Sequence, residues 1–573
     1  MSSIERPTAR ARVWSGRFPL LKHTSTGRQR WLALVLPFIV TALVLLPIGR
    51  LVYELLTPSW ELWQHMWDTF LPQMLENTLR LVIGVGLGTG IIGVGYAWLV
   101  SAYQFPGRAW FERLFLLPLA VPTFVMGFIF MATFDYAGPV QTQWRAWFGD
   151  GAYFPDIRSG LGVTIVMTLV LYPYVYLLAR AAFRAQSAST FEAARLMGYS
   201  RTGAFFRLVL PLARPAIVAG MVLAMMEAMT DYGAVSFFSF PTLSEGIVRI
   251  WEGRMDRDTA TQLAAILMLF ALGILLLEYI LRGQKRYTQE GLRGRQLERT
   301  PLRGPRGWLA SAACLALLSA AFILPFIQLI VWAVTEVREP SVGAWRSIYT
   351  DYITNSVRFA GLAGLIVIGL SLLVAYGVRA NALSGNRLVP RVMARLMTLG
   401  YALPGAVIAV GVLMLVAPFD HDLTDWVEIN LGREERSLLI TGTLTGLVYA
   451  YVVRFMAVGY NSVETSMERV NPSLEEAART MGARSPRIIA RVHMPLVRGG
   501  MIAGAILVFV DVMKEIPATL LLRPFGSDTL ALWAYFLAFE SFWQAAAIPS
   551  LTIVTIGLLP VLWLMQLDES RRL

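Results

Sequence analysis

Long apolar segments recur along the whole chain and are separated by shorter polar ones. Most of them reach the roughly 20 residues that a helix needs to cross a bilayer. The first part of the chain predicts six membrane-spanning helices, near residues 31–56, 77–103, 113–134, 160–183, 209–231 and 261–281. The second part predicts six more, near residues 308–335, 356–380, 394–418, 437–460, 496–517 and 545–566. The pattern indicates an all-α integral membrane protein with about twelve transmembrane helices.

A ten-residue phrase occurs twice and indicates that the two parts are homologous. The phrase Ser-x-x-Glu-Ala-Ala-Arg-x-Met-Gly begins at Ser189 and again at Ser473, an offset of 284 residues (473 minus 189). The same offset relates further identical residues: Arg207 and Arg491, Pro211 and Pro495, and Gly220 and Gly504. A fixed offset of this kind is the signature of an internal duplication. We therefore divide the chain into a first half (31–281), a linker (282–307) and a second half (308–566).

Each copy of the phrase predicts a short helix with a defined start and end. Two Ser–Glu pairs have the spacing of the capping box, in which the Ser is the N-cap: Ser189 with Glu192, and Ser473 with Glu476. Small side chains follow each Glu and would let another surface approach closely: Ala193, Ala194, Ala477 and Ala478. Gly198 and Gly482 stand where a helix would end in a left-handed conformation. We expect a helix-glycine-helix elbow between two membrane spans in each half.

Charge is concentrated in particular loops of a very apolar chain. The sequence of 573 residues is 56% hydrophobic and only 15% charged, with a formal net charge of +12. Basic residues gather in the N-terminal tail (1–30), in the linker and around the two phrases (about 188–208 and 472–494), whereas acidic residues gather in 135–159 and 419–436. By the positive-inside rule, the basic segments and both termini, including the tail 567–573, should be cytoplasmic and the two acidic loops external. The positive charge thus reflects topology and possible contact with anionic lipid, and it does not indicate nucleic-acid binding.

No motif for enzymatic chemistry or for a bound cofactor is present. A Walker A loop needs Gly-Lys followed by Ser or Thr, but the three lysines, Lys22, Lys285 and Lys514, are not preceded by Gly. The single cysteine, Cys314, lies in an apolar run, and the four histidines are scattered without ligand spacing. We expect a chain that is not an enzyme and has no cofactor or stable metal site. Any ATP hydrolysis would come from a separate subunit.

Two pairs of acidic residues lie within predicted spans at equivalent positions of the two halves. Glu227 and Asp231 correspond to Asp511 and Glu515 at the offset of 284, and each pair is four residues apart, hence on one helical face. Charges inside a span are costly and usually face a cavity or a partner, and carboxylate oxygens suit a hard cation. These four residues are our candidates for a substrate path that contacts a metal ion only transiently. The alternative is structural: Lys514 could neutralise Asp511, and all four acids could lie at the outer membrane rim.

The repeated phrase resembles the EAA loop of ABC-transporter permeases. Longer phrases resemble the iron(III) permease family, in which both permease halves are fused: 172–183, 230–238, 403–411 and 511–524. The resemblance covers about residues 30–566. It implies the type I (MetI-like) ABC importer architecture, two ABC ATPase subunits at the EAA loops, and a periplasmic or lipoprotein iron-binding protein on the outer face. It also implies the inner membrane as location and ferric iron import by alternating access.

Two other functions remain open from the sequence. The same machine could carry thiamine, a phosphonate or another small solute, and a small anion would favour basic groups along the path. A secondary transporter with its own ion coupling would also fit twelve spans in two halves of equal orientation. The paired EAA phrases argue against that second class.

Overall fold

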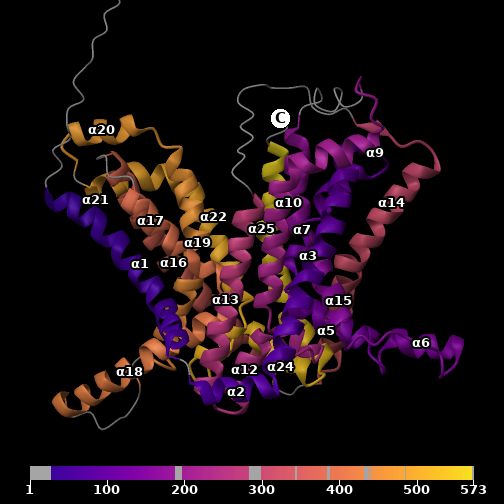
Figure 1. Cartoon of the computed structure of the whole chain (residues 1–573), viewed down its shortest axis with the longest axis horizontal. Helices are drawn as coiled ribbons and strands as arrows, with labels where there is room; N and C mark the ends of the chain where they lie inside the picture. The colour runs from indigo at the N-terminus through magenta and orange to yellow at the C-terminus, as the bar shows by residue number, and fades with distance from the viewer. Residues whose placement is uncertain are drawn as a thin grey trace, which may run out of the picture.

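The fold is a bundle of long helices (Figure 1). The computed structural model describes residues 27–570 except 58, 187–195, 283–298, 342–344, 384–387, 432–437, 439 and 484. Residues 1–26 of the predicted N-terminal tail, residues 283–298 of the linker and the start of the first EAA phrase lie outside the described residues.

The first half contains, in chain order, α1 (Gly27–Leu56), α2 (Trp60–Thr69), α3 (Leu71–Ala102), β1 (Tyr103–Gln104), α4 (Arg108–Leu114), η1 (Leu117–Ala120), α5 (Thr123–Phe134), α6 (Pro139–Phe148), α7 (Gly160–Ala185), α9 (Arg201–Ala204), η2 (Phe205–Val209), α10 (Leu210–Thr230), α11 (Gly233–Phe237), α12 (Leu243–Gly253) and α13 (Arg257–Arg282). After the linker, β2 (Thr300–Pro301) pairs in parallel with β1, which fixes the start of the second half beside the end of α3.

The second half repeats this order with α14 (Pro305–Leu318), η3 (Ser319–Ile323), α15 (Leu324–Arg338), α16 (Trp345–Leu383), α17 (Leu388–Met397), η4 (Thr398–Ala402), α18 (Gly405–Leu431), α19 (Leu444–Glu468), α20 (Pro472–Thr480), α21 (Ser485–Ile488), η5 (Ile489–His493), α22 (Met494–Met513), α23 (Pro517–Leu522), α24 (Leu530–Phe539) and α25 (Trp543–Ser570). The short π-helical turns η2 and η5 are related by the offset of 284, so the duplication extends to a local distortion.

Eleven helical segments in the described residues are long and apolar enough to cross a membrane. The remaining predicted span is α19, which carries Arg454, Asn461 and several tyrosines that lower its hydropathy. It is still a helix of 25 residues, and it packs against α16 and α22. The all-α membrane architecture expected from the sequence is confirmed.

The centre of each half is the same unit of three helices. In the first half α3, α7 and α10 pack on one another, and in the second half α16, α19 and α22 do so. α10 approaches α7 closely at Gly220, where an added Cβ would lie 2.7 Å from the Cα of Val175. A side chain at this position would push the two helices apart.

The first helix of each half packs against the other half. α1 contacts α16, α17 and α18, and lies beside them in Figure 1. On the opposite side α14 contacts α4, and α15 contacts α5. The two homologous halves are therefore interlocked, an arrangement that the duplication alone does not reveal.

Two predicted spans are broken. The span near 113–134 is divided among α4, η1 and α5, with Pro118 and Pro122 at the breaks. The span near 394–418 is divided in the same way among α17, η4 and α18, and Pro404 directly precedes α18. A proline lacks the amide donor and disfavours helix at the preceding residue, which accounts for both breaks.

The predicted external loop 419–436 is also wrong in part, because α18 continues to Leu431. Asp420 lies inside this helix, is buried, and accepts hydrogen bonds from the amides of Ile440 and Thr441 at 3.0 and 2.6 Å. Asp420 was predicted to lie in a loop, but its carboxylate fixes the backbone at Ile440 and Thr441, just before α19.

Candidate functional site

The second EAA phrase forms α20, but the helix begins earlier than predicted. Its N-cap is Asn471, whose side-chain oxygen accepts from the amide of Ser473 at 3.0 Å, and Pro472 occupies the first turn. Ser473 is thus inside the helix, and the expected capping box of Ser473 with Glu476 is not formed. Glu476 and Ala477 are exposed on the helix surface, whereas Ala478 is buried.

The predicted ends of both elbows are correct. Gly482 has φ +79° and Gly198 has φ +83°, which is the left-handed conformation that favours glycine. At α20 the amides of Gly482 and Ala483 bond to the carbonyls of Arg479 and Ala478 at 2.9 and 3.0 Å, the pattern of a Schellman motif. In the first phrase Ser189, Glu192, Ala193 and Ala194 lie outside the described residues.

Exposed apolar side chains gather at the two elbows. Leu196 and Met197 directly precede Gly198. In the second half Leu474 lies in the first turn of α20 and Met481 directly follows its last residue. All four side chains are exposed. α20 and α9 lie at the same end of the bundle, at the top of Figure 1. Both elbows therefore have exposed apolar side chains and lie at the same end of the bundle.

A buried carboxylate fixes α20 to the bundle. Glu475 is fully buried and lies 2.7 Å from Arg479, 3.3 Å from Arg379 of α16 and 3.5 Å from His493. Arg379 also donates to the carbonyls of Met467 and Val470. Burial alone would raise the pKa of Glu475, but the neighbouring His493 and Arg479 lower it to about 2. Phe191 stands at the equivalent position of the first half, so this anchor belongs to the second half only.

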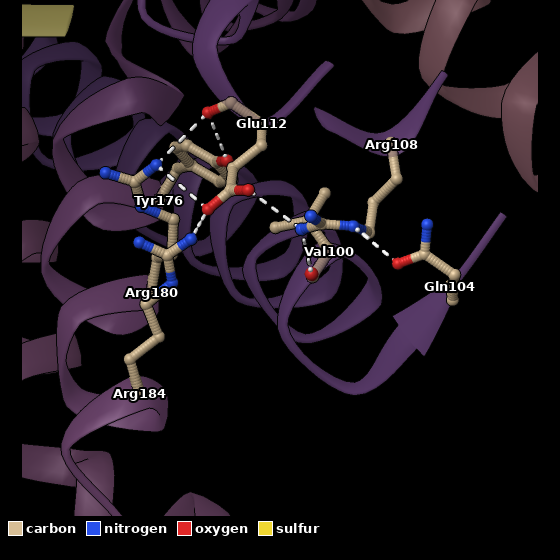
Figure 2. A network of polar contacts seen from close by, with 7 residues as sticks. All are labelled: Val100, Gln104, Arg108, Glu112, Tyr176, Arg180 and Arg184. Carbon is tan, nitrogen blue, oxygen red and sulfur yellow. Dashed lines mark hydrogen bonds and ion pairs between the residues drawn. The ribbon is translucent and has the colours of Figure 1, made fainter. Parts of the chain in front are cut away.

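The first half has its own buried network where α7 leads into the EAA phrase (Figure 2). The carboxylate of Glu112 is fully buried, lies 2.8 Å from Arg108, and pairs with Arg180 and Arg184 of α7. Tyr176 donates to the carbonyl of Glu112 at 2.8 Å. The network ties α4 to the end of α7, and the sequence analysis missed it. Two homologous glutamates, Glu464 and Glu468, replace Arg180 and Arg184 in the second half, so the charges there are reversed.

All four candidate acids line one cavity of about 120 Å³ between the halves. Its walls come from α5, α7 and α10 on one side and from η4, α19 and α22 on the other. Two basic side chains, Arg454 and Lys514, and two phenols, Tyr174 and Tyr401, also line it. The duplication therefore brings the two acid pairs together, as expected.

Asp231 and Glu515 lie between a long helix and the short helix that follows it, and each accepts a hydrogen bond from an amide in the first turn of the short helix. Asp231 accepts from the amide of Ala234 at 2.8 Å, and Glu515 accepts from the amide of Ala518 at 3.2 Å. Asp231 also accepts from the hydroxyl of Thr123. These hydrogen bonds give the two acids a structural role.

The acids differ in how their charge is compensated. Lys514 lies 2.9 Å from Asp511, as considered from the sequence, and Arg454 lies 3.2 Å from Glu515. Glu227 has no hydrogen bond or ion pair through its side chain within the described residues. The cavity thus holds four carboxyl groups against two basic groups, and the ion pairs found in the described residues involve the two acids of the second half. Arg454 escaped the sequence analysis, although it is a charge within a predicted span and the same reasoning could have found it.

Comparisons with known proteins match both halves. The family described as "Binding-protein-dependent transport system inner membrane component" matches twice, over residues 86–290 and 366–572. The "Fe(3+)-transport system permease protein FbpB 2" of Haemophilus influenzae is 26% identical over 535 residues, which cover 92% of this chain and 95% of that protein. The "Putative ferric transport system permease protein FbpB 1" of the same organism is 23% identical, over 82% of this chain and 73% of that protein. The "Sulfate transport system permease protein CysT" of Escherichia coli is 29% identical over 35% of this chain and 71% of its own length.

Proposed function

The chain belongs to the family of binding-protein-dependent transport system inner membrane components, and we propose that it is the fused permease subunit of an ABC importer for ferric iron. The central cavity carries this proposal. It lies between the two homologous halves, and its lining has four carboxyl groups against two basic groups. A pathway for a cation needs such a surplus in a low-dielectric interior, where an unpaired ion is otherwise expelled.

The donor atoms in the cavity fit a hard cation. Glu227 offers a carboxyl group without a hydrogen bond or ion pair in the described residues, and Tyr174 and Tyr401 line the same space with phenol oxygens. Hard metal ions prefer carboxylate, carbonyl and water oxygens to sulfur. Within the described residues, no group of three or more His, Cys, Asp or Glu side chains is arranged to hold a metal ion. In our proposal iron is a passing substrate, bound weakly enough to leave again.

The two elbows would contact two ABC ATPase subunits. Their exposed apolar residues, Leu196, Met197, Leu474 and Met481, point to a protein partner at the end of the bundle that holds α9 and α20. This end is cytoplasmic in our proposal, as are both termini. ATP binding would draw the ATPases and the elbows together, and the central cavity would open toward an iron-binding protein at the opposite end.

A small anion is the second candidate substrate, because a sulfate permease is among the relatives and two basic residues line the cavity. Arg454 and Lys514 each have a carboxylate partner at 3.2 and 2.9 Å, however. The side chain that remains without a partner is acidic. The lining therefore favours a cation.

Uptake of radioactive iron by the permease, reconstituted with its ATPase and iron-loaded binding protein, tests this proposal. We expect Glu227→Gln to lower initial uptake by about tenfold or more, equivalent to roughly 1.4 kcal/mol of lost ion stabilisation. Because Glu227 has no partner to lose, membrane expression and binding-protein-stimulated ATPase activity should persist. The control Glu540→Gln changes an exposed acid outside the cavity. Normal iron uptake by Glu227→Gln, or accumulation of an oxyanion in place of iron by the unaltered complex, would contradict the proposal.

A further inference from the structure

A second cavity, of about 540 Å³, lies between the halves and away from the EAA elbows. It is formed by α11 and α12 of the first half and α24 of the second. α12 and α24 lie at the lower end of the bundle in Figure 1. Its polar lining consists of two phenols, two carboxylates, one guanidinium and two hydroxyls: Tyr232, Tyr535, Glu245, Glu252, Arg249, Ser236 and Ser239.

Tyr232 lines both this outer cavity and the central one, so the two adjoin at its side chain. The hydroxyl of Tyr535 donates to that of Tyr232 at 3.0 Å and lies 3.1 Å from Ser236. Both tyrosines are buried, and they come from different halves. A contact between halves that move relative to each other can open, so this pair can separate the cavities in one state and join them in another.

Glu245 is only 9% exposed, and its carboxylate is incompletely satisfied. One oxygen lies 3.4 Å from Arg249, which is itself half exposed, and the other oxygen is buried without a hydrogen-bond partner. Burial raises the pKa of Glu245, an effect that Arg249 partly offsets. A buried carboxylate oxygen without a partner is costly, and a cation entering the cavity would stabilise it.

The second carboxylate, Glu252, is exposed and lies two helical turns farther along the same face of α12. Seven residues at 1.5 Å each place the two backbone positions about 10 Å apart. An ion would therefore meet the carboxylates in succession along the wall, and would not be enclosed by both. Such a series of weak oxygen contacts suits an ion that must be received and released.

We propose that the outer cavity receives the ferric ion before it enters the central cavity, with Glu252 at the rim, Glu245 deeper inside, and the Tyr232–Tyr535 contact as the barrier between the two cavities. The inference rests on the proposed function, since it assumes that a hard trivalent cation is the substrate. Arg249 competes with the ion for Glu245 and prevents the site from becoming a trap.

Direct binding of terbium, a hard trivalent ion whose luminescence is excited through nearby tyrosines, tests the site in the full-length permease held in lipid nanodiscs. Glu227→Gln is used as background, so that the central cavity contributes little. We expect Glu245→Gln with Glu252→Gln to weaken terbium binding by about tenfold or more. Arg249→Gln should strengthen it, because the competing cation is gone, and Glu540→Gln should leave it unchanged. Equal terbium affinity in the Glu227→Gln background and in the three variants made in it would overturn the inference.

Iron uptake by the reconstituted complex separates the inference from the proposed function. We expect Glu245→Gln with Glu252→Gln to lower uptake while the affinity for the binding protein stays the same. Normal iron uptake in this double variant refutes the outer site and leaves the proposed function intact. No iron uptake by the unaltered complex refutes both. A parallel loss of binding-protein affinity, with unchanged terbium binding, would identify the cavity as a docking contact and overturn the inference.

Discussion

Single residues break the symmetry of the central cavity. At the offset of 284, Asp511 corresponds to Glu227, but Lys514 corresponds to Thr230 and Arg454 to Val170. Both acids of the second half therefore have a basic partner, whereas the two acids of the first half have no ion pair in the described residues. A duplicated chain can diverge in this way, because one half can keep the contact with the substrate while the other is stabilised by ion pairs.

The sequence predicted the acids of this cavity because their spacing and their offset could both be read directly. Their separate roles could not be predicted in this way. The capping of α11 by Asp231 and of α23 by Glu515 depends on where α10 and α22 end. The partner of Glu515 is Arg454, 61 positions earlier, and a pairing over that distance follows from helix packing and not from local spacing.

Glu475 gives a pH dependence at the residue scale. Its pKa is about 2 in the fold against an ordinary value of 4.5, so the unfolded chain binds the proton more readily. The stabilisation is complete above about pH 4.5 and is lost as the pH falls toward 2. A difference of about 2.5 pKa units corresponds to roughly 3 kcal/mol. Acid-unfolding curves of the purified permease should therefore become flatter in this window for Glu475→Gln. The exposed neighbour Glu476→Gln is the control, and identical curves for both variants would contradict the assignment.

Among the elements, α20 has an end that the sequence predicted correctly and a start that it predicted two residues too late. Ser473 has the spacing to Glu476 of a capping box, and Asn471 is an equally good N-cap residue by type. Pro472 decides between them, since proline favours the first position of a helix and so places the cap one residue before it. The helix ends were predicted correctly, because only glycine fits the left-handed position well.

The start of α20 is testable by replacing the two candidate caps. We expect Asn471→Ala to cost about 1 kcal/mol, because the amide of Ser473 loses its acceptor. Ser473→Ala should change the stability of α20 by only a few tenths of a kcal/mol, since alanine is a better helix former inside the first turn. Amide hydrogen exchange of residues 473–480 in detergent measures both effects. If Ser473→Ala reduces the protection from exchange more than Asn471→Ala does, the cap is Ser473 and the assignment of Asn471 is wrong.

For the whole molecule, the sequence predicted the all-α membrane architecture and the duplication but not the interlocking of the halves. The offset shows which positions are equivalent, and it carries no information on which half a helix contacts. α1 packs on α16 and α17, and α15 packs on α5, so each half is completed by the first helix of the other. This explains why fusion into one chain is compatible with the fold: the linker needs only to join α13 to α14, and β2 pairs with β1 on the way.

Orientation in the membrane is the last prediction, and it follows from charge distribution together with the fold. The basic linker, the EAA elbows and the N-terminal tail should face the cytoplasm, and the ends of α6 and α18 should face outward. Exposed residues suit labelling at both ends: Tyr153 and Ile429 outside, Met197 and Met481 inside. The native Cys314 is buried, and Cys314→Ser removes it as background. In intact cells an impermeant maleimide should react with Tyr153→Cys and Ile429→Cys, and with Met197→Cys and Met481→Cys only after permeabilisation. Reaction of either methionine position in intact cells would invert the topology, and the outer cavity would then face the cytoplasm and could not receive an imported ion.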